Sequence, residues 1–310
     1  MIRARGLTKR YGNKVALADA TFDIQPGKVT GFLGPNGAGK STSMRLMMGL
    51  DKPTAGEVTI GGMRYTQHAA PLTLVGALLD AKGVHPGRSA RSHLRALAAT
   101  HRLGNARVEH VLGMTGLTDV AHKRVGGFSL GMGQRLGIAA ALLGDPQVLI
   151  LDEPVNGLDP DGVLWVRNLV RAQAAEGKTV LLSSHLMSEM AQTADHVIVL
   201  GRGRVIADTP IADLLGGDTP RVRVTTPDAS RLIQEVRTSG LGTTTELTID
   251  VESEHTVVIH GLRSPEVGRL CSARGIELHE LTPVGGNLED AYMALTRDDV
   301  EYQTLEPVAA

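Results

Sequence analysis

Residues 34–42 read Gly-Pro-Asn-Gly-Ala-Gly-Lys-Ser-Thr, and this stretch decides the fold class of the chain. It fits the pattern GxxxxGK[ST], a loop that binds the phosphates of a nucleoside triphosphate. Its glycines let successive backbone N–H groups curl around a phosphate, while Lys40 reaches the β- and γ-phosphate oxygens and the Ser41 hydroxyl binds Mg²⁺. An apolar run before the loop predicts a buried strand, and the pattern after it predicts a helix. Phosphate would then lie at a helix N-terminus, where the dipole favours anions.

We expect every residue of this phosphate-binding loop (P-loop) to contact the nucleotide. The nucleotide-binding residues predicted from it are Gly34, Pro35, Asn36, Gly37, Ala38, Gly39, Lys40, Ser41 and Thr42. The loop alone does not separate kinases, GTPases, helicases and transport ATPases, because all of them share the phosphate cradle.

Length and composition narrow the class of protein. The 310 residues suffice for one large α/β domain and a smaller module. The formal net charge of −1 argues against a strongly basic nucleic-acid-binding surface, and a single cysteine, Cys271, excludes an internal disulfide. No apolar run approaches the roughly 20 residues that span a bilayer, and the N-terminus lacks a signal peptide's apolar segment. We therefore expect a cytosolic protein whose membrane role, if it has one, comes through a partner.

The distribution of apolar runs predicts two domains. Val/Ile/Leu-rich runs recur up to about residue 206 with helical patterns between them, which predicts an α/β core with a mainly parallel sheet. Residues 86–143 lack such runs and predict a helical insertion into this core. After residue 216 the composition changes, and short runs rich in Thr and Val replace the longer apolar ones. We place the α/β core at 1–216 and a small accessory α+β domain at 217–310, ending in a helix over 287–296 that Asn287 would cap.

A second motif, VLILDEP at 148–154, brings two carboxylates to the end of a predicted buried strand. Ligands of open α/β sheets bind at the carboxyl ends of strands, so Asp152 can hold Mg²⁺ through water. Glu153 can orient or deprotonate an attacking water. An isolated Asp-Glu pair would more commonly be a pair of solvated charges. The P-loop in the same chain favours the metal and water roles instead.

Three further motifs accompany the P-loop and VLILDEP, one before VLILDEP in the chain and two after it. FSLGMGQRL at 128–136 places Ser129 and Gly131 at the start of an apolar helix, where they form either an anion site or a simple helix cap. GLDP at 157–160 and SSH at 183–185 come next. The P-loop, the Ser-Gly helix start, LDEP, GLDP and SSH together resemble the nucleotide-binding cassette of ABC transporters over about residues 2–215. This resemblance implies an ABC-type P-loop NTPase fold with a helical subdomain.

The resemblance also implies roles that the residues alone do not. Ser129 and Gly131 match the family's signature motif, which faces the γ-phosphate held by the other subunit of a head-to-tail dimer. Asp159 matches an aspartate at that dimer interface, and His185 matches the histidine that contacts the γ-phosphate. Tyr11 matches the aromatic residue that stacks on adenine. Without the resemblance, His185 would be interpreted as a structural or surface histidine and Tyr11 as a strand-surface tyrosine.

The sequence departs from the family pattern at two places. The signature is usually LSGGQ but reads FSLGM here, with Leu130 in place of the first glycine and Met132 in place of glutamine. Asp80 aligns with a loop glutamine, and a carboxylate can accept a bond from Mg²⁺-bound water but cannot donate as an amide does. The segment around Asp80 and the signature helix resemble the antibiotic and drug export branch. The region after 217 resembles the C-terminal extension of those export ATPases.

From these observations we expect an ATP-hydrolysing subunit that uses ATP and Mg²⁺ and drives a separate integral membrane permease, for export. Glu153, His185 and Lys40 would be catalytic, and Ser41, Asp152 and Asp80 would organise the metal. The chain would form a homodimer with two shared ATP sites, peripheral on the cytoplasmic face of the cell membrane, with no nucleic-acid partner. The alternatives are the ATPase of an importer and a soluble cassette ATPase of translation or repair. A soluble ATPase of translation or repair would be expected to have tandem cassettes or long heptad repeats, and this sequence has neither.

Overall fold

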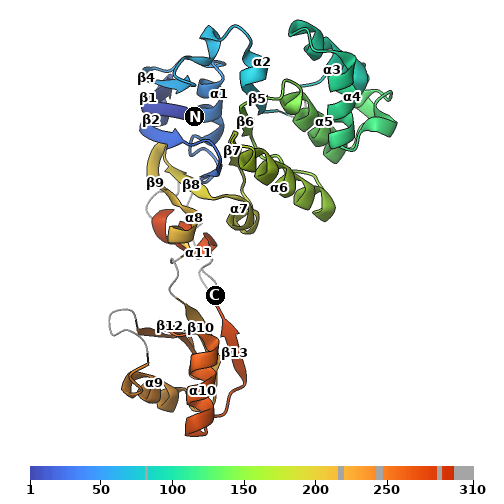
Figure 1. Ribbon diagram of the computed structural model, residues 1–310. Coiled ribbons are helices and arrows are strands. Elements are labelled where there is room, and N and C mark those ends of the chain that lie inside the picture. The colour runs from blue at the N-terminus through green and yellow to red at the C-terminus, as the bar shows by residue number, and fades with distance from the viewer. Residues whose placement is uncertain (81–82, 216–219, 242–246, 285–287, 297–310) are drawn as a thin grey trace, which may run out of the picture. The chain divides into compact units, whose positions relative to one another are not determined.

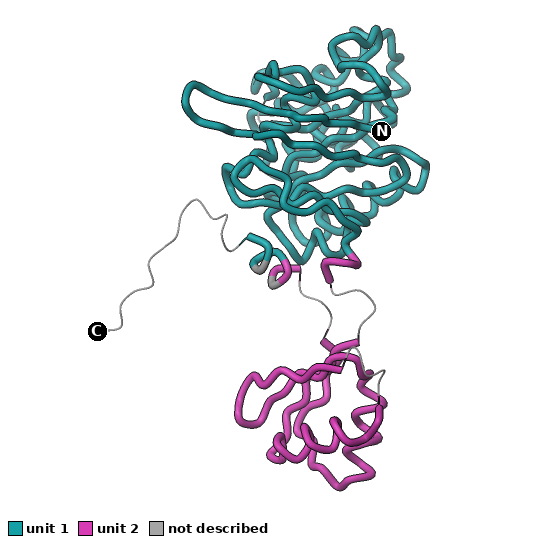
Figure 2. Tube along the Cα trace, turned by 90° about the vertical axis from the view of Figure 1, so that its left-hand side faces the viewer, with its two compact units in different colours: residues 1–211, 292–310 teal, residues 212–291 magenta. Residues whose placement is uncertain are grey.

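The computed structural model describes residues 1–80, 83–215, 220–241, 247–284 and 288–296. The chain divides into two compact units, one comprising residues 1–211 and 292–310 and the other residues 212–291 (Figure 2). The predicted domain boundary near residue 217 lies outside the described residues, as does Asn287. Among the described residues, no helix has the length and apolar character needed to cross a membrane.

A six-stranded sheet forms the centre of the first unit, in the order β5-β6-β7-β3-β8-β9 (Figure 1). Its strands are parallel except for β9, which pairs antiparallel with β8 in a hairpin. The strands are β3 (Val29–Leu33), β5 (Val75–Leu78), β6 (Val148–Leu151), β7 (Thr179–Ser183), β8 (His196–Gly201) and β9 (Arg204–Pro210). All residues of β3, β6 and β7 are buried, as a sheet covered on both faces requires. The predicted α/β fold with a mainly parallel sheet is confirmed.

A second, antiparallel sheet of the first unit has the order β2-β1-β4. It consists of β1 (Ile2–Tyr11), β2 (Lys14–Ile24) and β4 (Ala55–Ile60). Its apolar residues share a core with α1 (Lys40–Met47) and with the six-stranded sheet. Phe22 of β2 meets Phe32 of β3 edge to face, with ring centroids 5.4 Å apart. The start of α1 is therefore fixed between two sheets.

The remaining helices of the first unit flank these sheets. They are α2 (Pro71–Leu74), α3 (Ala90–Thr100), α4 (Asn105–Met114), α5 (Leu130–Leu142), α6 (Pro160–Ala175) and α7 (Met187–Thr193), with 3₁₀ turns η1 (Tyr65–Gln67), η2 (Thr118–Val120) and η3 (Val125–Gly127). Helices α3, α4 and α5 gather as a group on the β5 side of the sheet (Figure 1). They occupy the span for which the sequence predicts a helical insertion.

The second unit is a small α+β fold with the element order βαββαβ. Its antiparallel sheet runs β11-β12-β10-β13, and its helices α9 and α10 share one core with the sheet. The elements are β10 (Arg221–Thr225), α9 (Ala229–Thr238), β11 (Thr248–Val251), β12 (Thr256–His260), α10 (Ser264–Arg274) and β13 (Glu280–Pro283). Two short helices, α8 (Ile211–Leu214) and α11 (Leu288–Thr296), contain the residues at which the division between the units falls.

Candidate active site

The P-loop links the buried strand β3 to helix α1. Gly39, the residue before α1, has φ +108°, and a Cβ at this position would lie 2.8 Å from the carbonyl oxygen of Ala16. A Cβ at Gly34 would lie 2.5 Å from the carbonyl oxygen of Leu200. Both positions therefore require glycine. Since the first turn of a helix has no intrahelical acceptors for its N–H groups, the start of α1 offers donors to an anion.

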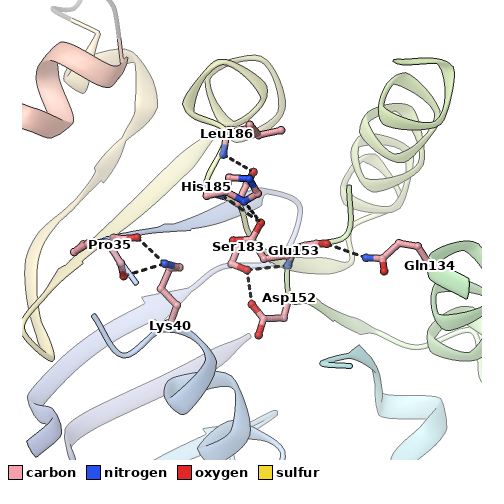
Figure 3. Close-up of polar contacts among 10 residues, drawn as sticks. Pro35, Lys40, Gln134, Asp152, Glu153, Ser183, His185 and Leu186 are labelled. Carbon is pink, nitrogen blue, oxygen red and sulfur yellow. Dashed lines mark hydrogen bonds and ion pairs between the residues drawn. The ribbon is translucent and has the colours of Figure 1, made fainter. Parts of the chain in front are cut away.

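Lys40 lies beneath this loop with 8% of its surface exposed. Its Nζ donates hydrogen bonds to the carbonyl oxygens of Gly34 and Pro35, the latter at 3.2 Å (Figure 3). Burial lowers the pKa of Lys40, and the nearby carboxylates of Glu153 and Asp152 act in the opposite direction. A buried ammonium group thus stands close to the place where phosphate charge would bind.

Asp152 and Ser183 lie at the carboxyl ends of the neighbouring parallel strands β6 and β7. The Ser183 hydroxyl donates to Asp152 Oδ1 at 2.6 Å and accepts from the backbone N–H of Glu153 at 2.9 Å (Figure 3). The Asp152 N–H donates to the carbonyl oxygen of Leu78 on β5 at 2.7 Å. Hydrogen bonds to β5 and β7 therefore hold the Asp152 backbone and carboxylate at the end of β6.

Glu153 follows with its backbone in the left-handed region, at φ +49°, which is unusual for a residue with a side chain. Its carboxylate oxygen Oε2 lies 2.8 Å from His185 Nδ1 and accepts the backbone N–H of His185 at 3.3 Å. The side chain of Glu153 is 24% exposed and that of His185 is 56% exposed. The structure thus brings the predicted base and the predicted histidine into direct contact.

Lys40, Asp152 and Glu153 all line one cavity of about 520 Å³. Its lining comprises Pro35, Asn36, Gly37, Ala38, Gly39, Lys40, Ser41, Thr42, Leu79, Asp80, Leu130, Gln134, Asp152, Glu153 and Asn156. All three predicted metal-binding residues, Ser41, Asp152 and Asp80, are among them. His185 does not line the cavity, but its Nδ1 contacts the carboxylate of Glu153, which does.

This donor set suits Mg²⁺. A hydroxyl and carboxylates are hard oxygen ligands, and Mg²⁺ commonly takes one or two protein oxygens, several waters and substrate phosphates. Among the described residues, no group of three or more His, Cys, Asp or Glu side chains could hold a metal. The hard oxygen donors that line the cavity therefore fit a Mg²⁺ ion that also takes water and phosphate oxygens.

Ser129, Gly131 and Asp159 do not line this cavity. Ser129 caps α5 by accepting the N–H of Met132 at 3.2 Å, and Asp159 caps α6 by accepting the N–H of Gly162 at 2.9 Å. Both caps are exposed. A Cβ at Gly131 would lie 3.0 Å from the carbonyl oxygen of Gly157, so the start of α5 lies against the loop that precedes α6.

Tyr11 also lies outside the cavity lining, at the end of β1, and is 47% exposed. Its hydroxyl donates to Asp51 at 2.7 Å, which raises the pKa of Tyr11, and Asp51 also binds Arg45 at 2.8 Å. The Lys9 ammonium lies 4.8 Å from the centre of the Tyr11 ring. The ring is therefore held in place at its hydroxyl while remaining accessible.

Sequence reasoning missed several residues of the site. Gln134, Asn156 and Leu79 line the cavity, and Ser183 joins Asp152 to Glu153. Ser183 lies within the SSH motif and Gln134 within the signature helix, so both had a nearby signal. Neither motif showed which side chains contact Asp152 and Glu153, because that depends on how the strands and α5 are packed.

A glycine-rich phosphate cradle, a buried lysine and strand-end carboxylates define a P-loop nucleoside triphosphatase. The chain belongs to the ABC transporter ATP-binding proteins: residues 17–156 match the ABC transporter family, and its relatives carry that description. It is an ATP-binding and ATP-hydrolysing protein of this family, as expected. Residues 220–289 match a domain of unknown function.

Three relatives illustrate the range of the family. The chain is 39% identical to the bacitracin transport ATP-binding protein of Bacillus licheniformis, over 69% of this chain and 71% of the relative. It is 33% identical to the daunorubicin resistance ATP-binding protein of Streptomyces coeruleorubidus over 96% of both chains. It is 38% identical to an uncharacterised ABC transporter ATP-binding protein of Bacillus subtilis, over 74% of this chain and 76% of the relative.

Solved structures show the same cassette fold. An ATP-binding subunit of an ABC transporter matches with a TM-score of 0.64 and 28% identity, over 69% of this chain and 91% of that chain. An ATP-binding cassette in a dimeric post-hydrolysis state, bound to ADP and Pi, matches with a TM-score of 0.62 and 25% identity. This second match covers 68% of this chain and 99% of that chain. Both matches confirm the expected P-loop NTPase core.

Proposed function

We propose that this chain is the ATPase subunit of a membrane exporter of drugs, antibiotics or other hydrophobic cargo. It acts as a homodimer beside a separate integral membrane permease. Relatives named for bacitracin transport and daunorubicin resistance support the export assignment. The observation that carries the chemistry is the single cavity that joins the P-loop to Asp152 and Glu153.

ATP binds with its phosphates in the P-loop, where backbone N–H groups and the Lys40 ammonium neutralise their charge. Ser41 and Asp152 would hold Mg²⁺, and the Asp80 carboxylate, in the same cavity, would be a further hydrogen-bond acceptor. When bound, the metal neutralises phosphate charge as a Lewis acid. Tyr11 stacks on the adenine ring at the edge of the site.

Hydrolysis uses Glu153 as the general base. Glu153 takes a proton from water as the water oxygen bonds to the γ-phosphorus. The bond from that phosphorus to the bridging oxygen of ADP then breaks. His185, in contact with the Glu153 carboxylate at 2.8 Å, orients it and reaches the γ-phosphate. Lys40 stabilises the charge that develops on the phosphate oxygens.

The signature residues complete the site of a second subunit. Ser129 and Gly131 face the γ-phosphate bound by the partner's P-loop, and Asp159 lies at the same interface. Ser129 and Asp159 are exposed, and all three residues lie outside this chain's own cavity lining, which supports this arrangement. The dimer works at the cytoplasmic face of the membrane, with the permease rather than a nucleic acid as its partner.

The test of this mechanism is the dimer state of Glu153→Gln, measured by light scattering with Mg²⁺ and either ATP or ADP. The substitution should leave ATP binding intact and slow hydrolysis by about 10² to 10⁴, the usual contribution of a positioned base. The dimer should then accumulate with ATP, because ATP is a shared ligand of both subunits. Adding Ser129→Arg should remove this dimer. A monomer with both nucleotides, together with intact hydrolysis, contradicts the mechanism.

The membrane partner is tested by affinity purification of the tagged chain from detergent-solubilised membranes of its native host. We expect an integral membrane protein to co-purify, with more recovered for Glu153→Gln in the presence of ATP. Transport assays of vesicles containing both proteins would then distinguish export from import. Recovery of ribosomes or DNA-repair proteins instead would favour the soluble-ATPase alternative.

A further inference from the structure

The backbone of Glu153 needs external support. Its φ of +49° lies in a region that side-chain-bearing residues rarely occupy, so neighbouring groups must hold it there. The Ser183 hydroxyl accepts the Glu153 N–H at 2.9 Å, which fixes one side of the residue. The carbonyl oxygen of Glu153 accepts the Asn156 N–H at 3.2 Å and the side-chain amide of Gln134, Nε2, at 2.8 Å.

Gln134 differs from the other supports because it comes from a different part of the unit. It lies in α5, within the helical group formed by α3, α4 and α5, and is 4% exposed. Figure 3 shows its side chain reaching from that helix to the Glu153 carbonyl. It also lines the cavity that contains the P-loop. The helical group therefore has a direct side-chain contact with the backbone of the hydrolytic residue.

We propose that Gln134 is a positioning residue that holds the Glu153 carboxylate in place for hydrolysis. This inference rests on the proposed function, in which Glu153 is the general base. The amide suits the task because it donates to a carbonyl oxygen while carrying no charge into a buried site. Without it the strained peptide relaxes, and the carboxylate moves relative to the attacking water.

The same helix links this contact to the second ATP site of the dimer. Ser129 caps α5 and, in the proposed dimer, faces the partner's γ-phosphate. Gln134 lies five residues further along, which is about 7.5 Å on the helix axis. Helix α5 therefore carries both Ser129 at its start and the amide that contacts the Glu153 carbonyl.

Gln134→Met tests the inference because methionine keeps the length of the side chain and removes the donor. We expect kcat to fall by about 10-fold to 10²-fold, as misplacing a catalytic group by about 1 Å does. The KM for ATP should change less than twofold. Because binding is kept and hydrolysis slowed, light scattering should show more dimer with Mg²⁺ and ATP than for the unmodified protein.

Gln173→Met is the matched control. Gln173 is also a buried helical glutamine, 6% exposed in α6, but it bonds Lys178 at 3.0 Å and does not line the cavity. Its replacement should leave kcat unchanged. An equal fall of kcat in both variants, or an unchanged kcat in Gln134→Met, overturns the proposal.

The double variant Glu153→Gln with Gln134→Met separates this inference from the proposed function. If Gln134 acts through Glu153, the double variant should hydrolyse ATP no more slowly than Glu153→Gln alone. A further fall overturns the inference. If Glu153→Gln by itself keeps full hydrolysis, the proposed function fails instead, whatever Gln134→Met does.

A second substitution keeps the inference testable if Gln134→Met does not fold. Gln134→Glu preserves the shape of the side chain, and the introduced carboxyl can donate to the Glu153 carbonyl only when it is protonated. The kcat of Gln134→Glu relative to the unmodified protein should therefore rise as pH falls. A ratio that is independent of pH contradicts the inference.

Discussion

At the scale of single residues, the site combines burial with hydrogen bonds that hold each charge in place. Lys40 donates to two carbonyl oxygens of its own loop, and Asp152 accepts from Ser183 at 2.6 Å. Side chains fixed in this way lose little further conformational entropy when a ligand binds. The charged groups of the cavity are therefore preorganised for a phosphate and a metal ion.

The first prediction concerns Lys40. Lys40→Ala removes the buried ammonium group and should lower ATP affinity by about 1.5 to 3 kcal/mol, the contribution of a hydrogen bond to a charged group. This corresponds to roughly 10-fold to 10²-fold in Kd. Isothermal titration calorimetry measures the change, with the exposed lysine variant Lys123→Ala as the control. Equal ATP affinity for Lys40→Ala and the unmodified protein would contradict the P-loop assignment.

The second prediction concerns Asp80, which lines the cavity beside Ser41 and Asp152. If its carboxylate accepts a hydrogen bond from metal-bound water, Asp80→Ala should raise the Mg²⁺ concentration for half-maximal hydrolysis by about tenfold. A Mg²⁺ titration of ATPase activity measures this, alone and with the permease. Asp119→Ala, which removes an exposed carboxylate outside the cavity lining, is the control. If Asp80→Ala and the unmodified protein give the same Mg²⁺ titration curve, both alone and with the permease, Asp80 has no role near the metal.

At the scale of elements, the start of α5 is tightly apposed to the loop before α6. Gly157 in that loop has φ +74°, and a Cβ there would lie 2.3 Å from Leu130 Cδ2. Arg135 of α5 stacks over Trp165 of α6, with the guanidinium carbon 4.6 Å from the ring centre. The Leu130 that departs from the usual signature therefore occupies the space above a glycine. This contact joins the helix start at Ser129 to the loop that carries Asp159.

The third prediction tests this contact between Leu130 and Gly157 with the substitution Gly157→Ala. Gly177→Ala is the matched control, because Gly177 has φ +87° and an open space where its Cβ would be. Both substitutions should cost about 1 to 2 kcal/mol from the left-handed backbone, and both should lower the thermal unfolding midpoint. Gly157→Ala alone should also weaken ATP-dependent dimerisation, because it displaces Leu130. Adding Leu130→Ala should restore the dimer. Equal dimerisation of the Gly157→Ala and Gly177→Ala variants would contradict a role of the contact between Leu130 and Gly157 in dimerisation.

At the scale of the whole molecule, the ATP site and the C-terminal fold belong to different compact units. Every residue lining the cavity lies before residue 157, and the second unit comprises residues 212–291. The residues from Tyr292 onward belong to the first unit, and Tyr292 itself is 9% exposed. A cut near 217 therefore also removes a buried part of the cassette unit, which the sequence did not indicate.

The fourth prediction compares two deletions. A chain ending at residue 215 and a chain in which a Gly/Ser linker replaces residues 216–287 should both bind ATP with normal affinity. The internal deletion should have the higher thermal unfolding midpoint, because it keeps Tyr292 and the buried apolar surface around it. Fluorescent-nucleotide binding and thermal unfolding measure the two effects. A folded internal deletion that does not bind ATP would place part of the site in the second unit.

The sequence alone determined the fold class and the principal chemistry of the site. The P-loop specifies its own conformation, because glycines at 34 and 39 fit close backbone approaches, and the apolar runs of β3, β6 and β7 specify buried strands. Elements with weaker patterns were missed. β5 is only four residues long. The apolar run that ends near residue 206 forms the two strands of the β8-β9 hairpin, because Arg202 and Gly203 turn the chain at positive φ.

Only the tertiary structure decided which side chains meet. Gln134 reaches the Glu153 carbonyl, Ser183 joins Asp152 to Glu153, and Leu130 fills the space above Gly157. The two partners of each contact are 19 to 31 residues apart in the sequence. No local sequence pattern therefore encodes these contacts. Motif spacing fixes what a residue can do chemically. The packing of α5 against the strand ends fixes which of those residues act together.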